Sequence, residues 1–139
     1  MKIAALSVSA AALLFAGAAT AQESPLRLTF QTSASEGVVM VAVFDSEAAW
    51  NGGGAPAAVA RVEAGAGPVE AAFELPAGDY AVRAFHDVDG DGELNTNPFG
   101  IPIEPFAFSN DARGRMGPPG WSAARFTVSG PTAQTIDLR

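Results

Sequence analysis

The chain has 139 residues, a formal net charge of −7 and no cysteine. This length suits one domain with a substantial core, and the lack of cysteine excludes disulfides and a lipid on an N-terminal cysteine. The excess of acids and the lack of a basic cluster argue against binding to nucleic acid and favour cations or basic partners.

The first residues have the pattern of a secretory signal peptide. Lys2 precedes an apolar run over residues 3–18, and an A-x-A cleavage signal follows at residues 19–21. The run is shorter than the roughly 20 apolar residues that span a bilayer, so we expect cleavage after Ala21 and no membrane anchor. The mature domain, residues 22–139, is therefore expected in the periplasm or outside the cell, and no later segment predicts a membrane span.

Short segments of alternating apolar and polar residues predict strands along most of the mature chain. The period-2 alternation at residues 26–30 is typical of a half-buried strand. The continuous apolar run GVVMVAVF, residues 37–44, predicts a central strand that is buried on both faces. Similar patterns lie at residues 71–76, 79–86, 104–109, 124–129 and 134–139, and a possible short strand lies at 58–62 in an otherwise loop-like stretch.

One short helix is expected among these strands. Asp45 or Ser46 would cap EAAW, residues 47–50, and three following glycines would end it. Trp50 and Trp121 are expected to cover edges of the core. Six or seven short strands without a long helix predict an all-β fold: a single antiparallel β-sandwich, immunoglobulin-like or of the transthyretin and carboxypeptidase-regulatory type.

The densest group of acids follows the strand predicted at residues 79–86. Asp87, Asp89 and Asp91 occupy positions 1, 3 and 5 of a D-x-D-x-D-G frame, whose glycines let the backbone curl around one ion. Glu93, at position 7, would offer its backbone carbonyl, and Asn95, at position 9, would bind directly or through water. These five residues predict a structural Ca²⁺ site.

The frame departs from an EF-hand at its end. Pro98 stands where an EF-hand has a bidentate glutamate, so the missing ligand would come from Asn97 or from Glu104 folding back. An incomplete ligand set predicts weak affinity, of the order of 10⁻⁴–10⁻³ M. The alternative is a metal-free turn in which the Asp and Asn side chains bond their own backbone. Oxygen ligands beside a single histidine disfavour zinc.

The only histidine, His86, adjoins these acids. The sequence has no G-x-S-x-G elbow and no H-E-x-x-H helix, and His86 and Asp87, as strand neighbours, point to opposite faces. We therefore expect His86 to be a packed or a surface residue and the protein not to be an enzyme, and a hydrolase that uses His86 is the least favoured alternative.

A second dense stretch, residues 99–121, reads FGIPIEPFAFSNDARGRMGPPGW. Its aromatic and basic side chains, which could line a patch for a small ligand, peptide or glycan, are Phe99, Phe106, Phe108, Trp121, Arg113 and Arg115. The alternative is a long loop held to the sandwich by buried aromatics. Arg113 could also pair with Glu104 or with an acid of the preceding loop.

Four motifs follow one another in the second half of the chain. They are L-P-x-G-x-Y-A-V from Leu75, H-D-x-D-x-D-G-x-L-x-T-N from His86, F-G-I-P-x-E from Phe99 and F-S-N-x-A-R-G-R-x-G-P-P from Phe108. Together they resemble the bacterial family called domain of unknown function 2141. The resemblance implies an exported β-sandwich without an assigned activity. That family commonly has an acid where Asn95 stands here, so Asn95 implies weaker metal binding.

The sequence thus predicts a non-enzymatic exported envelope protein, a monomeric binding or interaction module with a structural calcium loop. Its partner, whether protein, peptide or glycan, is not encoded in any motif found here.

Overall fold

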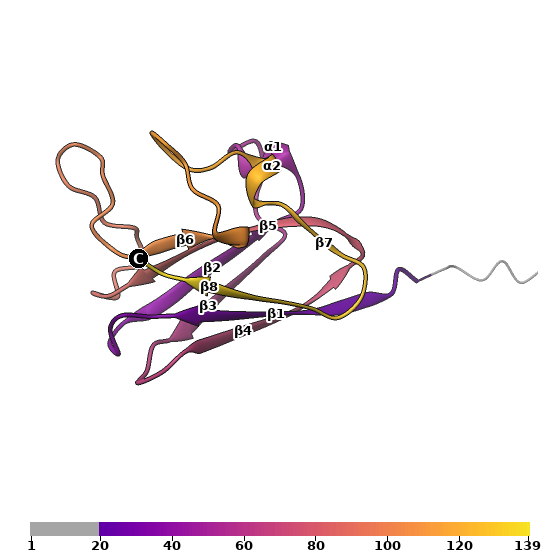
Figure 1. The fold of residues 1–139 in the computed structure, drawn as a ribbon, viewed down its shortest axis with the longest axis horizontal. Coiled ribbons are helices and arrows are strands. Elements are labelled where there is room, and N and C mark those ends of the chain that lie inside the picture. The colour runs from indigo at the N-terminus through magenta and orange to yellow at the C-terminus, as the bar shows by residue number, and fades with distance from the viewer. Residues whose placement is uncertain (1–19) are drawn as a thin grey trace, which may run out of the picture.

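The computed structural model describes residues 20–139, so all but the last two residues of the predicted signal peptide lie outside the described part. Figure 1 shows two β-sheets packed face to face. The elements in chain order are β1 (Glu23–Gln31), β2 (Val38–Phe44), α1 (Glu47–Trp50), β3 (Ala58–Glu63), β4 (Val69–Pro76), β5 (Gly78–Asp87), β6 (Phe106–Phe108), the 3-10 turn η1 (Ser109–Asp111), α2 (Trp121–Ala124), β7 (Phe126–Val128) and β8 (Thr132–Asp137). Neither of the two helices in this part of the chain is long or apolar enough to cross a bilayer.

The predicted all-β sandwich is confirmed, with eight strands within residues 20–139 where six or seven were expected. One sheet has the order β4-β1-β8, and the other has the order β3-β2-β5-β6, with β7 paired to the start of β5. The count rises because β3, expected only as a possible strand, pairs with β2 along its whole length. One ladder also departs from the antiparallel prediction, since β1 and β8 run parallel. The alternation of apolar and polar residues indicates which face of the sheet each residue occupies, but it does not indicate whether the neighbouring strand is parallel or antiparallel.

The main core lies between the two sheets and follows the predicted alternation. On β1, Leu26, Leu28 and Phe30 are fully buried, whereas Arg27 between them is exposed. They pack against side chains of β2, β4, β5 and β8 in one continuous cluster. The alternating sequence of β1 is therefore explained by one face in the core and one in solvent.

A second, smaller core covers the opposite face of the β3-β2-β5-β6 sheet. Trp50 of α1 is only 1% exposed, and its ring packs edge-on against Phe44, Phe108 and Trp121 at centroid distances of 5.5, 5.9 and 6.3 Å. Its Nε1 donates to the carbonyl of Pro119 at 3.0 Å. Both tryptophans thus cover the core edge as expected, and β2 is buried on both faces as predicted.

Helix α1 begins as the sequence predicts. Ser46 is the N-cap residue, and its Oγ accepts a hydrogen bond from the backbone N–H of Ala49 at 3.3 Å. Arg83 of β5 lies beneath the helix, where its guanidinium stacks 4.1 Å from the Trp50 ring and donates to the Trp50 carbonyl. These contacts fix the segment that crosses the outer face of the sheet.

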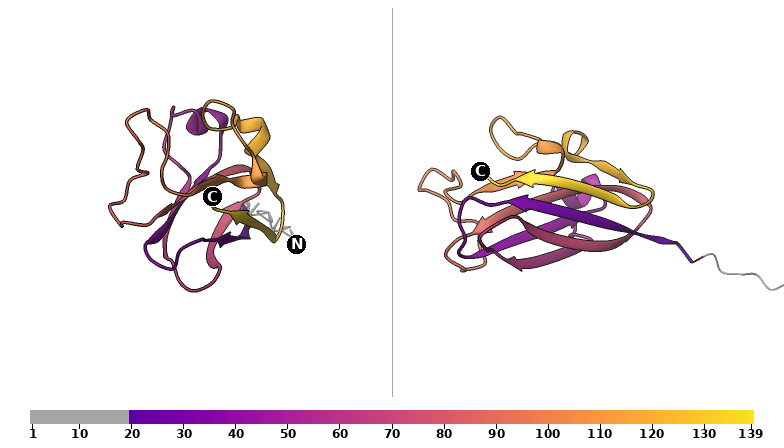
Figure 2. Two further views of the ribbon diagram at one scale, coloured as in Figure 1. Left: turned by 60° about the vertical axis from the view of Figure 1, so that its left-hand side comes forward. Right: turned by 60° about the horizontal axis from the view of Figure 1, so that its bottom comes forward.

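Two loops project beside each other from the sandwich. The β5–β6 loop, residues 88–105, and the η1–α2 loop, residues 112–120, both rise above β6 in Figure 1, and both extend beyond the sheets in Figure 2. The acidic stretch that begins at Asp87 and the aromatic and basic stretch at residues 99–121 therefore lie next to each other on the surface.

Candidate functional site

The acidic turn, Asp87–Asn95, starts from the last residue of β5. The Asp87 side chain is fully buried. Its Oδ1 accepts from the N–H groups of Gly90 (2.8 Å) and Asp91 (3.2 Å), and its Oδ2 accepts from Gly92 (2.8 Å). Gly90 and Gly92 have φ angles of +76° and +84°, which glycine adopts without strain. Asp87 therefore fixes the shape of the turn through its own backbone, as the metal-free alternative requires.

The same turn also brings the three aspartates together. Carboxylate oxygens of Asp87, Asp89 and Asp91 all lie within 4.8 Å of one another. Oxygens that share one Ca²⁺ at about 2.3–2.6 Å need this spacing. A carboxylate has roughly four lone-pair positions, so the hydrogen bonds that these groups accept leave room for an ion. The arrangement thus fits both the hydrogen-bonded turn and the calcium site.

The other two predicted ligands are Glu93, through its backbone carbonyl, and Asn95. The N–H of Glu93 donates to Asp91 Oδ1 at 2.8 Å, and its exposed side chain has no part in the predicted site. Asn95 faces the cluster with its amide nitrogen, which donates to Asp89 Oδ2 at 2.8 Å. The amide of Asn95 would have to turn over before its oxygen could reach an ion.

Glu104 folds back onto the turn, as the sequence suggested, and serves there as a hydrogen-bond acceptor. Its Oε1 accepts from the N–H of Val88 and its Oε2 from that of Asn95, both at 3.0 Å. One buried carboxylate therefore joins the two ends of the acidic turn. Asn97 caps the next turn instead, because its Oδ1 accepts from the N–H groups of Phe99 and Ile101 at 2.9 and 3.0 Å.

The pKa values of two acids shift in opposite directions. Burial raises the pKa of Asp87, but hydrogen bonds from Gly92, Asp89 and the neighbouring N–H groups outweigh it and hold that pKa below its ordinary value. The N–H of Asp91 lowers the pKa of Asp89, but desolvation, the hydrogen bond with the Asp87 carboxyl group, and the charges of Asp91 and Glu104 together raise it. The turn thus concentrates negative charge, and a bound cation would relieve the repulsion.

His86 is a packed strand residue. Its ring is fully buried, and Nε2 lies 2.7 Å from the carbonyl oxygen of Glu36 and therefore carries the proton. Nδ1 has no hydrogen-bond partner, so within residues 20–139 no hydroxyl or carboxylate bonds to the ring. The histidine ties β5 to the segment before β2.

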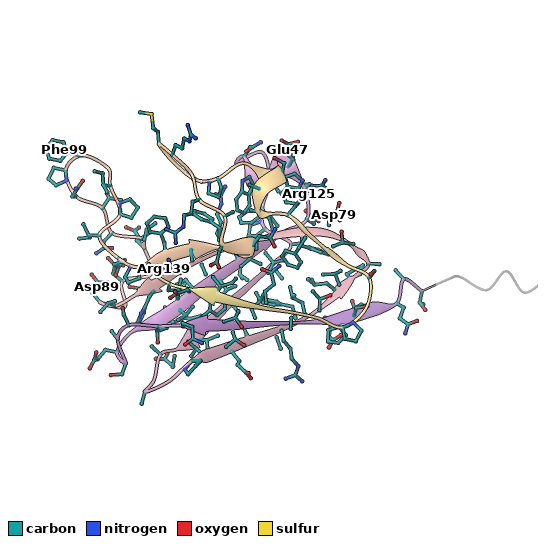
Figure 3. All side chains as sticks on the ribbon, viewed as in Figure 1. Glu47, Asp79, Asp89, Phe99, Arg125 and Arg139 are labelled. Carbon is teal, nitrogen blue, oxygen red and sulfur yellow. The ribbon has the colours of Figure 1, made fainter. Side chains whose placement is uncertain are left out.

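A groove of about 820 Å³ lies between the β5–β6 loop and the η1–α2 loop. Its apolar lining includes Leu94, Phe99, Ile101, Phe106, Phe108 and Met116, and its charged lining comprises Asp111, Arg113, Arg115, Asp137 and Arg139. Figure 3 shows Phe99 at the tip of one loop. Phe99 is 88% exposed there, and Met116 is fully exposed on the other loop. The volume is within the range of small-molecule sites, about 300–1,000 Å³.

The predicted aromatic patch is present in part. Phe99, Phe106 and Phe108 line the groove, whereas Trp121 packs into the second core. The suggested ion pair of Arg113 is wrong, because the ion pairs within residues 20–139 are Arg125–Asp79 and Arg139–Asp137.

Sequence reasoning missed part of the groove. Met116 had a local signal, as an apolar residue in a stretch of glycine and arginine. Asp137 and Arg139 had none, because the end of β8 meets the two loops only after the sheet order is set.

The comparison with family models agrees with the four motifs. The model described as "Uncharacterized protein conserved in bacteria (DUF2141)" matches residues 30–137, which confirms the resemblance. The match includes both loops and the acidic turn. No curated protein and no solved structure matches the chain significantly.

Proposed function

The chain belongs to this bacterial family, and we propose that it is an exported, non-enzymatic binding module of the envelope. Its binding surface is the groove between the two loops, and a structural Ca²⁺ holds the acidic turn at the base of the β5–β6 loop. Export rests on the signal-peptide pattern of residues 1–21.

The observation that carries this proposal is the groove with apolar side chains at its tips. Phe99, Ile101 and Met116 are 88%, 59% and 102% exposed and all line the same hollow. Large apolar side chains gathered on two adjacent loops leave water only when a ligand or partner covers them. A partner that fills the groove would gain this burial.

Calcium is proposed for the acidic turn on the spacing and charge of its oxygens. The side chains of Asp87, Asp89 and Asp91 would hold the ion, helped by the Glu93 carbonyl and by Asn95. The ion would neutralise the crowded carboxylates and stiffen the turn from which the groove loop departs. Its role in this proposal is structural.

The non-enzymatic proposal is supported by the chemistry of the groove and of His86. The groove lining contains no histidine, cysteine, serine or threonine, and of its two carboxylates, Asp111 and Asp137, the second is paired with Arg139. His86 is fully buried, and its bonded nitrogen meets a backbone carbonyl.

Binding of a neutral apolar dye such as Nile red tests the groove. We expect fluorescence enhancement with the parent protein and its loss in Ile101→Asp, since a charge in the apolar wall opposes the dye. Val59→Asp is the matched control, because Val59 is 68% exposed on β3, at the other edge of that sheet. Equal enhancement in all three proteins would show that the dye does not use the groove and would count against this proposal.

A further inference from the structure

The chemistry of the groove narrows its ligand to one class, an inference that rests on the proposed binding surface. We infer that the groove binds a single anionic amphiphile, a molecule with an acyl or similar apolar body and a carboxylate or phosphate head. The apolar body would lie between the two loops, and the head would meet the arginines of the η1–α2 loop.

The apolar body is supported by the walls of the groove. Phe99 and Ile101 face it from one loop, Met116 from the other, and Phe106 and Phe108 form its base on β6. A flexible chain of methylene groups can contact both walls at once, and each buried CH₂ contributes favourably.

The polar lining argues against a sugar. Among the residues that line the groove there is no Ser, Thr, Asn, Gln, Tyr or Trp. A glycan needs neutral donors and acceptors for its hydroxyls, and each unpaired hydroxyl that it buried would cost affinity. The polar side chains that do line the groove are all charged, which suits a ligand with one charged end.

A peptide that adds a strand is also disfavoured. Strand β6 is the edge of its sheet, but the outward N–H of Phe106 already donates to the carbonyl of Arg139 at 3.0 Å. A peptide that adds a strand gains affinity from main-chain hydrogen bonds, and at least one of the backbone donors that it would need on β6 is already occupied.

The anionic head is supported by the charges at the groove. Arg139 and Asp137 are paired at 2.7 Å, which leaves Arg113 and Arg115 against the single carboxylate of Asp111. Neither Arg113 nor Arg115 has an ion pair within residues 20–139, and both are exposed. Guanidinium groups bind carboxylate and phosphate through paired hydrogen bonds. Two such groups in a chain of net charge −7 select a negative ligand at this place.

A single molecule fits better than a bilayer surface. A flat membrane would touch the loop tips and leave the groove between them unfilled. Asp89, Asp91 and Glu93 also lie exposed in the β5–β6 loop, and Figure 3 shows Asp89 on the same side of the molecule as Phe99. These acids would repel an anionic membrane.

Calorimetric titration with dodecanoate below its micelle concentration, in a chelator-containing buffer, tests the inference. We expect one molecule per chain, and binding that is about tenfold weaker or worse in Ile101→Asp and in the double variant Arg113→Ala/Arg115→Ala. Val59→Asp and Arg61→Ala, exposed changes on β3, should bind as the parent does. All the changed side chains are exposed, and circular dichroism verifies that each variant is folded.

Four results would overturn the inference, and they show whether the proposed binding surface fails with it. If dodecyltrimethylammonium binds as tightly as dodecanoate, with no effect of the arginine changes, the claim of an anionic head group is wrong, while the proposed binding groove stands. If the protein binds phosphatidylcholine–phosphatidylglycerol vesicles but not dodecanoate, the groove binds a bilayer surface and not a single molecule. If no dodecanoate binds while Nile red still does, the ligand class is wrong and the proposed groove stands; if neither binds, both fail.

Discussion

The two halves of the long β5–β6 loop differ in how their groups are satisfied: one is held by hydrogen bonds, and the other exposes apolar side chains. In the acidic turn, Asp87 and Glu104 together accept five hydrogen bonds from the backbone of the turn. A few residues later, Phe99, Ile101 and Ile103 are 88%, 59% and 66% exposed. The backbone N–H groups of the first half donate to Asp87 and to Glu104, which reaches back from the far end of the loop, whereas the second half leaves apolar side chains uncovered. The comparison separates a part that stabilises the fold from a part that is available to a ligand.

Asp87→Ala should give the largest loss of stability. It removes the acceptor of three backbone N–H groups at a fully buried position, which predicts a loss of roughly 3 kcal/mol in the free energy of unfolding. Urea denaturation in the presence of chelator measures it. Asp91→Ala is the control, since Asp91 is exposed and accepts from one N–H. Equal losses in the two variants would mean that burial of Asp87 has no special role.

Calcium should raise the melting temperature of the protein by several degrees. An ion that binds only the folded state adds about 1.4 kcal/mol at tenfold above its dissociation constant, which is about 1–10 mM Ca²⁺ for the weak affinity expected here, and Mg²⁺ should add less. Melting in chelator and in millimolar Ca²⁺ measures the shift, which Asp89→Ala should abolish and Glu70→Ala on β4 should leave intact. A shift that survives Asp89→Ala would place the ion elsewhere, and no shift in the parent would make the turn metal-free.

Glu104→Gln should cost about 1–2 kcal/mol, less than the loss of Asp87. The amide retains one acceptor for Val88 or Asn95 and turns an NH₂ group towards the other N–H. Faster amide hydrogen exchange at Val88 and Asn95 would show directly that these N–H groups have lost their hydrogen bonds to residue 104. Unchanged protection of both amides would refute the idea that Glu104 holds the ends of the turn together.

Asp79, at the other end of β5, is a carboxylate with a side chain that is 41% exposed. Thr127 Oγ1 donates to it at 2.7 Å and Arg125 at 2.9 Å, and these contacts lower the pKa of Asp79. Because the folded pKa lies below the unfolded one, the stabilisation is present above about pH 4 and is lost as the pH falls through the folded value.

Thr127→Val should therefore move the pKa of Asp79 upward towards its ordinary value, with little change in stability at pH 7. An NMR titration of the Asp79 carboxyl carbon measures this shift. Thr135→Val, another exposed threonine, should leave it in place. An unmoved pKa in Thr127→Val would assign the shift to Arg125 instead.

The sequence by itself determined what depends on neighbouring residues. Alternation on β1 showed which side chains are buried, Asp45 or Ser46 was expected at the start of α1 and Ser46 is the N-cap, and D-x-D-x-D-G predicted the acidic turn. Each of these features forms within a few residues, so side-chain direction and local hydrogen bonding suffice to predict it.

Only the tertiary structure decided what depends on distant partners. The parallel pairing of β1 with β8, the packing of Trp121 against the second core, and the contribution of Arg139 to the groove join residues far apart in the chain. Glu104 could be named as a candidate from its position, but its role as acceptor for both ends of the turn required the fold. Local sequence patterns determine which side chains face the core and where turns form. Strand direction and the contact between the two loops depend on how the sheets pack, because only packing brings distant residues together.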